Sequence, residues 1–275
     1  MQGYPSILQY WKKSQKDFEN NLTILQQQIN TDAVHDIRVA IKKLRAFLNL
    51  YMIVKNEPDF EILLSKTNDL FDVLGRYRDI EICLAQTIAF EKDTGRSCKE
   101  FKSCLQSLLK ITRAWANQEI HRFHKKELAK IALLLKQDSS LADNIMFSKA
   151  LAAVIINQLA ETKKHFRQPH LVRRNLKEIY YWVPLFDNES TQDTWYQKEL
   201  HSILDDLGNW QDQEILDVRI RHFRKDYLPK SFEEYERLKD FQNKIKDSKK
   251  VLLKAANSKA RRWIKKVTDK EKSEV

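Results

Sequence analysis

Basic side chains stand at regular intervals in one short stretch near the start of the sequence. They follow one another at spacings of three, four and three residues: His35, Arg38, Lys42 and Arg45. On a helix, which advances by about 100° per residue, these side chains fall within an arc of about 80°. Each cation of such a row can make charge-assisted hydrogen bonds to a successive oxyanion. The spacing therefore indicates a surface for a linear phosphate-bearing ligand.

The same pattern returns later in the chain. Its members are His170, Arg173 and Lys177, with Arg174 beside them. The position that corresponds to the fourth cation, Arg45, holds Tyr180, so the second row lacks a cation there. Both histidines come within about one turn of a predicted helix start, where free N–H groups and the helix dipole favour an anion. A basic helix face is often simply solvated, but such a face has no reason to keep the same residue types in register twice.

A second motif, Leu-Gly-x-x-x-Asp, also occurs twice. The copies are Leu74-Gly75 with Asp79, and Leu207-Gly208 with Asp212. Because both motifs recur at nearly the same separation, we predict a tandem duplication. Glycine inside a helix costs about 1 kcal/mol relative to alanine, so we expect another helix or backbone to approach closely at Gly75 and Gly208. We expect Asp79 and Asp212 to hold basic residues of a facing helix, and Arg78 to contact a ligand.

The composition sets limits on the fold and on the ligand. The 275 residues include only four glycines, which argues against a fold of many β-hairpins and against a glycine-rich phosphate loop. Lys and Arg number 49 against 38 Asp and Glu, a formal net charge of +11 that points to an anionic partner. The three cysteines have no CxxC spacing and predict neither a disulfide framework nor a thiolate zinc site. We expect no metal and no cofactor.

Helical periodicity runs from end to end of the chain and is interrupted by turn residues. The predicted helices span about 6–29, 31–54, 60–90 and 98–136, then 145–167, 169–187, 191–226 and 230–268. A polar stretch over 137–144 separates the two groups. We therefore predict an all-α fold of two pseudo-symmetric four-helix bundles with long antiparallel helices, one in residues 1–140 and the other in residues 141–275.

These motifs, in this order, resemble the signature of the CHAD domain, the conserved histidine α-helical domain, over about residues 5–266. The resemblance implies two helical halves around a shared basic cavity that binds inorganic polyphosphate. It also implies a non-catalytic module, sometimes linked to triphosphate-processing enzymes. The predicted polyphosphate-binding residues are the two basic rows and Arg78: His35, Arg38, Lys42, Arg45, Arg78, His170, Arg173, Arg174 and Lys177. Lys42 stands where arginine is usual, and Glu178 and Tyr180 replace two expected cations.

The predicted last helix offers an alternative site. Between Lys244 and Lys266 there are ten Lys or Arg and one acidic residue, so most of the excess positive charge lies here. This helix could line the polyphosphate cavity, bind nucleic acid or carry a solvated face. We rank nucleic acid below polyphosphate as a partner. An accessory role in a polyphosphate- or triphosphate-processing system is a further alternative.

No arrangement typical of catalysis or of membrane insertion stands out in the sequence. The carboxylate pairs Asp205-Asp206 and Glu233-Glu234 have no nearby nucleophile. No stretch reaches the 18 uncharged apolar residues typical of a membrane span. We therefore expect a non-enzymatic, cytoplasmic protein that associates with polyphosphate granules or with a polyphosphate-metabolising enzyme, and that does not insert into a membrane.

Overall fold

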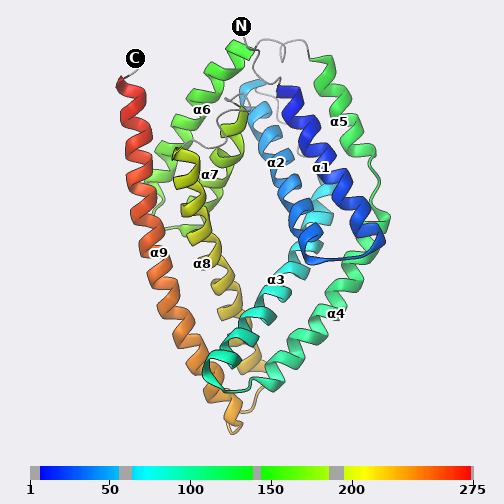
Figure 1. Ribbon diagram of the computed structural model, residues 1–275, viewed down its shortest axis with the longest axis vertical. Coiled ribbons are helices and arrows are strands. Elements are labelled where there is room, and N and C mark those ends of the chain that lie inside the picture. The colour runs from blue at the N-terminus through cyan, green and yellow to red at the C-terminus, as the bar shows by residue number, and fades with distance from the viewer. Residues whose placement is uncertain (1–6, 56–63, 139–143, 186–194, 274–275) are drawn as a thin grey trace.

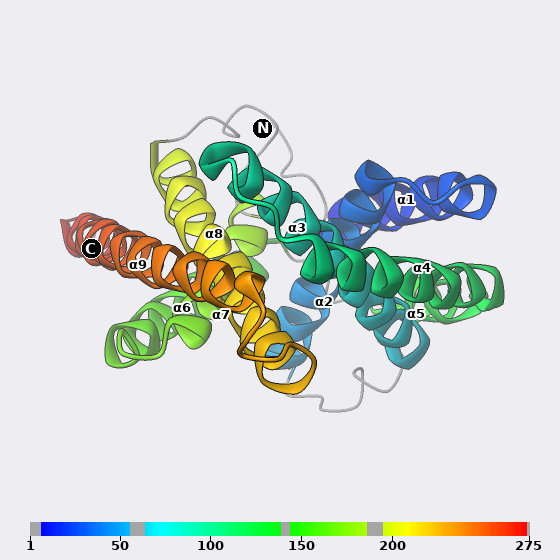
Figure 2. The same cartoon turned by 90° about the horizontal axis from the view of Figure 1, so that it is seen from below.

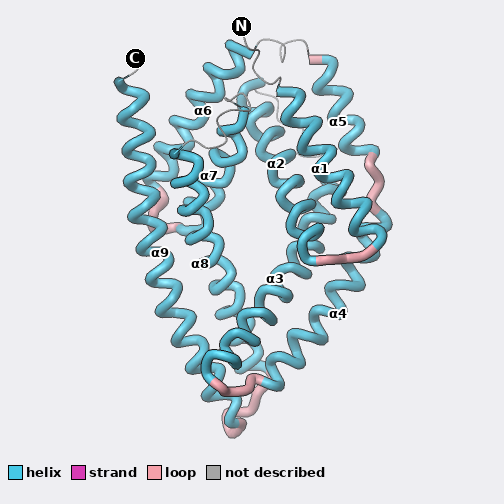
Figure 3. The backbone as a smooth tube through the Cα atoms, viewed as in Figure 1, coloured by secondary structure: helices cyan, strands magenta, loops and turns pink. Residues whose placement is uncertain are grey.

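The computed structural model of the protein describes residues 7–55, 64–138, 144–185 and 195–273 (Figure 1). Every regular element in these ranges is helical, and no strand occurs among them (Figure 3). The predicted all-α fold is confirmed. In chain order the elements are α1 (Ile7–Gln27), α2 (Thr31–Lys55), α3 (Ser65–Thr94), α4 (Lys99–Arg122), α5 (Lys126–Gln137), α6 (Asn144–Lys164), α7 (Pro169–Trp182), the short 3-10 helix η3 (Val183–Leu185), α8 (Trp195–Asp226) and α9 (Glu233–Ser273).

The helices of the two halves pack in the same order. In the first half α1 packs on α2, α2 on α3 and α3 on α4, and α1 also contacts α4 and α5. In the second half α6 packs on α7, α7 on α8 and α8 on α9, and α6 also contacts α9. Across the halves, α2 packs on α7 and α3 on α8 (Figure 1, Figure 2). The tandem duplication itself stays a prediction, and its boundary at residue 140 lies outside the described residues.

The two central helices, α2 and α7, are amphipathic, and their apolar sides bind the halves together. α2 begins where the Asn30 side chain accepts a hydrogen bond from the Ala33 N–H group at 2.8 Å. In α7 the buried Trp182 donates from Nε1 to the carbonyl oxygen of Ala46 in α2 at 2.7 Å. The Tyr10 hydroxyl of α1 donates to the carbonyl oxygen of Tyr181 at 2.9 Å. The basic rows of α2 and α7 are therefore carried on helices that touch directly.

One predicted helix is divided in two. The segment predicted as a single helix over 98–136 forms α4 and α5, so that prediction was wrong. The backbone is extended at Phe123, with φ −69° and ψ 126°. The Phe123 ring is buried against the Phe18 ring of α1, 5.2 Å between centroids. Beyond this anchor, α5 turns to pack on α1 and buries three apolar side chains, those of Leu128, Ile131 and Leu135.

The buried apolar side chains form two cores, and each contains residues of both halves. The larger core contains buried residues of every α-helix from α1 to α9. The smaller core lies where α3 and α4 meet α8 and α9, toward the lower end of Figure 1. There the Phe90 and Phe241 rings stack with centroids 4.0 Å apart, and the Phe101 and Phe223 rings lie 5.2 Å apart. The halves are thus joined near both ends of the molecule.

Glutamates from other helices complete the first turns of α3 and α4. Glu127 of α5 accepts hydrogen bonds from the backbone N–H groups of Lys66 at 3.1 Å and Thr67 at 3.2 Å. Glu234 of α9 is buried and accepts from the N–H groups of Glu100 at 2.9 Å and Phe101 at 2.8 Å. The first N–H groups of a helix have no partner within it, so these acids both cap the helices and tie them to their neighbours.

Candidate functional site

The basic row of α2 gathers around an aromatic ring of α3. The guanidinium carbons of Arg38 and Arg45 lie 4.1 Å and 4.3 Å from the centre of the Phe71 ring, and the Lys42 nitrogen lies 5.8 Å from it. Arg38 Nη1 also donates to the Phe71 carbonyl oxygen at 2.5 Å, and Arg45 Nε donates to Asn68 Oδ1 at 2.6 Å. Cations are attracted to an aromatic face, so Phe71 helps to hold three members of the row.

Sequence reasoning missed Phe71, although its position gives a signal. It stands one helical turn before Gly75, on the face of α3 that Arg38 approaches. A Cβ atom added at position 75 would lie 2.5 Å from Arg38 Nη1. The close approach expected at this glycine is therefore made by a side chain and not by a helix or backbone.

At Gly208 the expectation of close approach is wrong. Among the described residues, apart from its two chain neighbours and the local backbone of its own helix, no heavy atom lies within 4 Å of a Cβ added at this position. The two copies of the Leu-Gly-x-x-x-Asp motif therefore use their glycines differently. Only the glycine of the first copy makes room for a member of a basic row.

The two basic rows meet at Lys42 and Lys177. α2 packs on α7, and the positive charge of Lys177 acts on Lys42. The charges of Arg38 and Arg173 act on both lysines. Burial first, and then these neighbouring cations, lower the pKa of Lys42 to about 6 and that of Lys177 to about 8. Cations from both halves of the chain are thus concentrated in one partly buried place.

Two carboxylates balance part of this charge. Asp79 of α3 interacts electrostatically with Arg38 and with Arg173. Asp212 of α8 interacts with Arg173. Burial raises the pKa of both carboxyl groups, and the arginines act in the opposite direction. The aspartates of both motif copies therefore face basic residues of neighbouring helices.

The two histidines and Arg78 lie at the edges of the rows. His35 is exposed, and partial burial of its ring followed by the charge of Lys42 lowers its pKa. His170 is exposed, and its ring meets the Trp210 ring edge-on at a centroid distance of 4.8 Å. Arg78 is held by an ion pair to Glu81 at 3.3 Å.

Arg174 lies in a different place from the rest of its row. It lines a pocket of about 450 Å³ between α2, α6 and α7, together with His165, Asn175 and Glu178. Glu178 accepts a hydrogen bond from Gln158 Nε2 at 2.8 Å. Burial raises the Glu178 pKa, which the charge of Arg174 opposes. The electrostatic partner of Arg174 is therefore Glu178 of its own helix.

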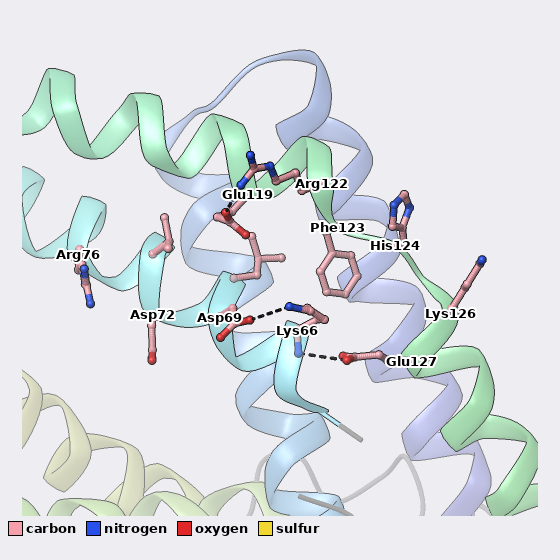
Figure 4. Close-up of a pocket in the computed structure, with 12 residues that line it drawn as sticks. Lys66, Asp69, Asp72, Arg76, Glu119, Arg122, Phe123, His124, Lys126 and Glu127 are labelled. Atoms are coloured by element: carbon pink, nitrogen blue, oxygen red, sulfur yellow. Dashed lines mark hydrogen bonds and ion pairs between the residues drawn. The ribbon is translucent and has the colours of Figure 1, made fainter. Parts of the chain in front are cut away.

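A second pocket, of about 660 Å³, lies where α4 ends and α5 begins (Figure 4). None of the predicted site residues lines it. Its acids and bases form ion pairs, among them Lys66 with Asp69 at 3.5 Å and Arg122 with Glu119 at 3.6 Å. Because both signs of charge line this pocket, it lacks the positive character of the basic rows.

Several cations of α9 are committed to acids of α8. Lys249 contacts Glu214 at 2.5 Å and Asp217 at 3.1 Å. Lys259 contacts Asp206 at 2.7 Å, and Lys266 contacts Glu199 at the same distance. Other cations of this helix are exposed: Lys244, Lys246, Lys254, Arg262 and Lys265. The excess charge of α9 is thus divided between helix packing and an exposed face.

The described part of the chain holds no group of three or more His, Cys, Asp or Glu side chains arranged to bind a metal ion. Within the same residues, no helix is both long and apolar enough to cross a membrane.

The fold and the site define an all-helical protein in which basic rows from two helical halves converge. A sequence profile of the CHAD domain matches residues 10–221, most of the chain, and the protein belongs to the CHAD domain family. All nine predicted site residues fall inside the matched range, whereas α9 lies beyond it.

The fold resembles a solved structure, the crystal structure of the CHAD domain from the plant Ricinus communis. The two share 17% sequence identity at a TM-score of 0.67, with 93% of this chain and 90% of that chain covered. No curated protein matches the sequence.

Proposed function

We propose that the protein binds inorganic polyphosphate, without catalysis, through the basic rows of α2 and α7. The observation that carries the proposal is the packing of α2 on α7, which brings Lys42 and Lys177 within electrostatic reach of each other and of Arg38 and Arg173. Membership of the CHAD family supports the choice of ligand, since the resemblance implies polyphosphate. Arginines suit this task because the planar guanidinium remains charged and binds phosphate through two parallel hydrogen bonds.

The physical basis of binding is the replacement of counterions along a polyanion by fixed cations. Affinity should therefore fall steeply as salt concentration rises. A longer chain presents more phosphates to the same site and should bind more tightly. Burial among like charges makes the empty site electrostatically unfavourable, and a bound phosphate relieves that repulsion.

Two observations support a non-catalytic role. One member of each carboxylate pair that the sequence offers for acid–base chemistry is occupied in packing. Asp206 is paired with Lys259 at 2.7 Å. Glu234 caps α4.

On this proposal the protein acts in the cytoplasm, associated with polyphosphate granules or with a polyphosphate-metabolising enzyme.

The test is a titration with long-chain polyphosphate of the native protein and of the double variant Arg38→Glu, Arg173→Glu. We expect the variant to bind at least about tenfold more weakly and to show a shallower salt dependence, by about one unit of slope for each phosphate that is no longer neutralised. The control is Lys110→Glu with Lys130→Glu, which changes the net charge equally at exposed positions outside the rows. Equal affinity of the native protein and the Arg38, Arg173 variant would refute the site.

The exposed cations of α9 favour a second candidate, nucleic-acid binding. It predicts that Lys246→Ala, Lys254→Ala and Arg262→Ala together abolish RNA or DNA binding, while the Arg38, Arg173 variant still binds. Competition separates the two proposals. Displacement of a nucleic-acid probe by polyphosphate at much lower phosphate concentration than the reverse favours polyphosphate.

A further inference from the structure

Two arginines of the second half have a buried donor atom without a hydrogen-bond partner. Among the described residues, Nε of Arg173 in α7 and Nε of Arg219 in α8 are both in this state. A buried donor that stays unpaired costs free energy, so a donor of this kind is available to an incoming acceptor. Arg173 belongs to the basic row of α7, whereas Arg219 belongs to neither row.

Arg219 lies on the side of α8 that faces α3. It stands seven residues after Asp212, and a helix that advances about 100° per residue brings the two to within about 20° of the same direction. On this side Leu216 and Ile220 are fully buried in the smaller core, which also contains Cys83 of α3. α3 packs on α8 (Figure 1). Arg219 therefore continues the inner side of α8, about 10 Å along the helix from Asp212.

Three arginines from three helices act on Asp79 of α3. Burial raises the pKa of this carboxyl group, and the charges of Arg38, Arg219 and Arg173 act in the opposite direction. Among the described residues, none of the three arginines is in ion-pair contact with a carboxylate. They are thus near one carboxylate without being committed to it. Because the three arginines outnumber Asp79 and Asp212, positive charge remains for an anion.

Arg224, further along α8, has a different environment. Its Nε is also buried without a partner. Its guanidinium group, however, donates to Gln242 and lies 4.2 Å from the centre of the Tyr235 ring, and both residues belong to α9. Arg224 therefore serves the packing of α8 on α9, whereas Arg219 faces the helix that carries Asp79.

We propose that Arg219 is a further polyphosphate-binding residue, which extends the site from the two rows along the inner side of α8. This inference rests on the proposed function and adds a surface of α8 to that site. A chain bound at Arg38 and Arg173 continues past Asp212 to Arg219, whose planar guanidinium binds phosphate oxygens through parallel hydrogen bonds. Because the distance along α8 is about 10 Å, several consecutive phosphates are needed, and Arg219 contributes to the binding of long chains only.

The test is a titration of the native protein and of Arg219→Gln with long-chain polyphosphate and with tripolyphosphate, at several salt concentrations. We expect Arg219→Gln to bind the long chain at least about fivefold more weakly, with a salt dependence shallower by about one unit of slope, because one phosphate contact is lost. Tripolyphosphate should bind both proteins alike. Arg219→Lys keeps the charge but not the planar fork, so it should retain the native slope with an intermediate affinity.

The matched control is Arg221→Gln, which removes the same charge from the same helix at an exposed arginine that pairs with Asp217 at 3.3 Å. It should bind both ligands as the native protein does. Native affinity of Arg219→Gln for the long chain would overturn the inference. An equal loss for tripolyphosphate would overturn the extended path. Weaker binding with an unchanged salt slope would indicate a structural effect and overturn the phosphate contact.

A measurement on the native protein does not depend on the folding of a variant. Modification of arginines by phenylglyoxal, followed by mass spectrometry of peptides, should be slowed at Arg219 by long-chain polyphosphate and not by tripolyphosphate, while Arg221 reacts equally in all samples. No protection of Arg219 would refute the inference. If Arg38 and Arg173 are protected in that case, the proposed function still stands, whereas absence of binding by the native protein would refute both.

Discussion

Arg38 connects more parts of the site than any other residue of its row. It contacts the ring and the carbonyl oxygen of Phe71, and it fills the space left by the missing side chain of Gly75. Its charge acts on Lys42 and on Asp79. Position 75 therefore contributes to the site without presenting any chemical group to a ligand.

The two motif glycines give a matched pair of substitutions. Gly208→Ala should raise the free energy of unfolding by about 0.5 to 1 kcal/mol, because alanine is the better helix former and nothing obstructs its Cβ. Gly75→Ala should gain less stability and should weaken polyphosphate binding several-fold, because Arg38 has to move. Chemical denaturation and polyphosphate titration measure both effects. An equal response of the two variants in both assays would contradict this assignment.

The sequence predicts the basic rows but not their local partners. Spacing on a helix shows that Arg38, Lys42 and Arg45 share a side, because the helical period is fixed. It does not show which side chain of another helix they meet, since that depends on how the helices pack. For this reason the spacing does not reveal Phe71, and it places Arg174, only one residue from Arg173, in a row from which packing separates it.

Among the helices, the division between α4 and α5 is the clearest difference between the two halves, because α9 of the second half is unbroken. The segment 98–136 has neither glycine nor proline, so no local signal ends a helix there. The cause is a distant contact, the burial of Phe123 against Phe18. Helix starts marked by polar or proline residues are predicted more closely, as at Pro169 in α7, because those signals are local.

Capping between helices leads to a prediction for Glu234. Its carboxylate accepts two backbone N–H groups at the start of α4 and has 7% of its surface exposed. Glu234→Ala should lower the free energy of unfolding by about 1 to 2 kcal/mol, the range found when a helix cap is removed. Glu233→Ala is the control, because the neighbouring side chain is 81% exposed and makes only a surface pair with Arg237. Urea denaturation that shows no difference between the variants would argue against the cap.

For the whole molecule, the interleaving of the two cores leads to a prediction about unfolding. Each core contains residues of both halves, so neither half can unfold while its partner keeps a complete core. We expect a single thermal transition in which the calorimetric and van't Hoff enthalpies agree. Two separated transitions would show that the halves are independent domains. Polyphosphate should shift the single transition to higher temperature, because it binds only the folded chain.

The contact between α2 and α7 also has a mechanical consequence. The Trp182 to Ala46 hydrogen bond lies on the boundary between the halves, where the charge of Lys177 also acts on Lys42. A polyanion bound by both rows would span that boundary and transmit force from one half to the other. Force that pulls the halves apart would then act on many phosphate contacts in parallel. The protein with bound polyphosphate would therefore unfold at a higher force than the protein without it.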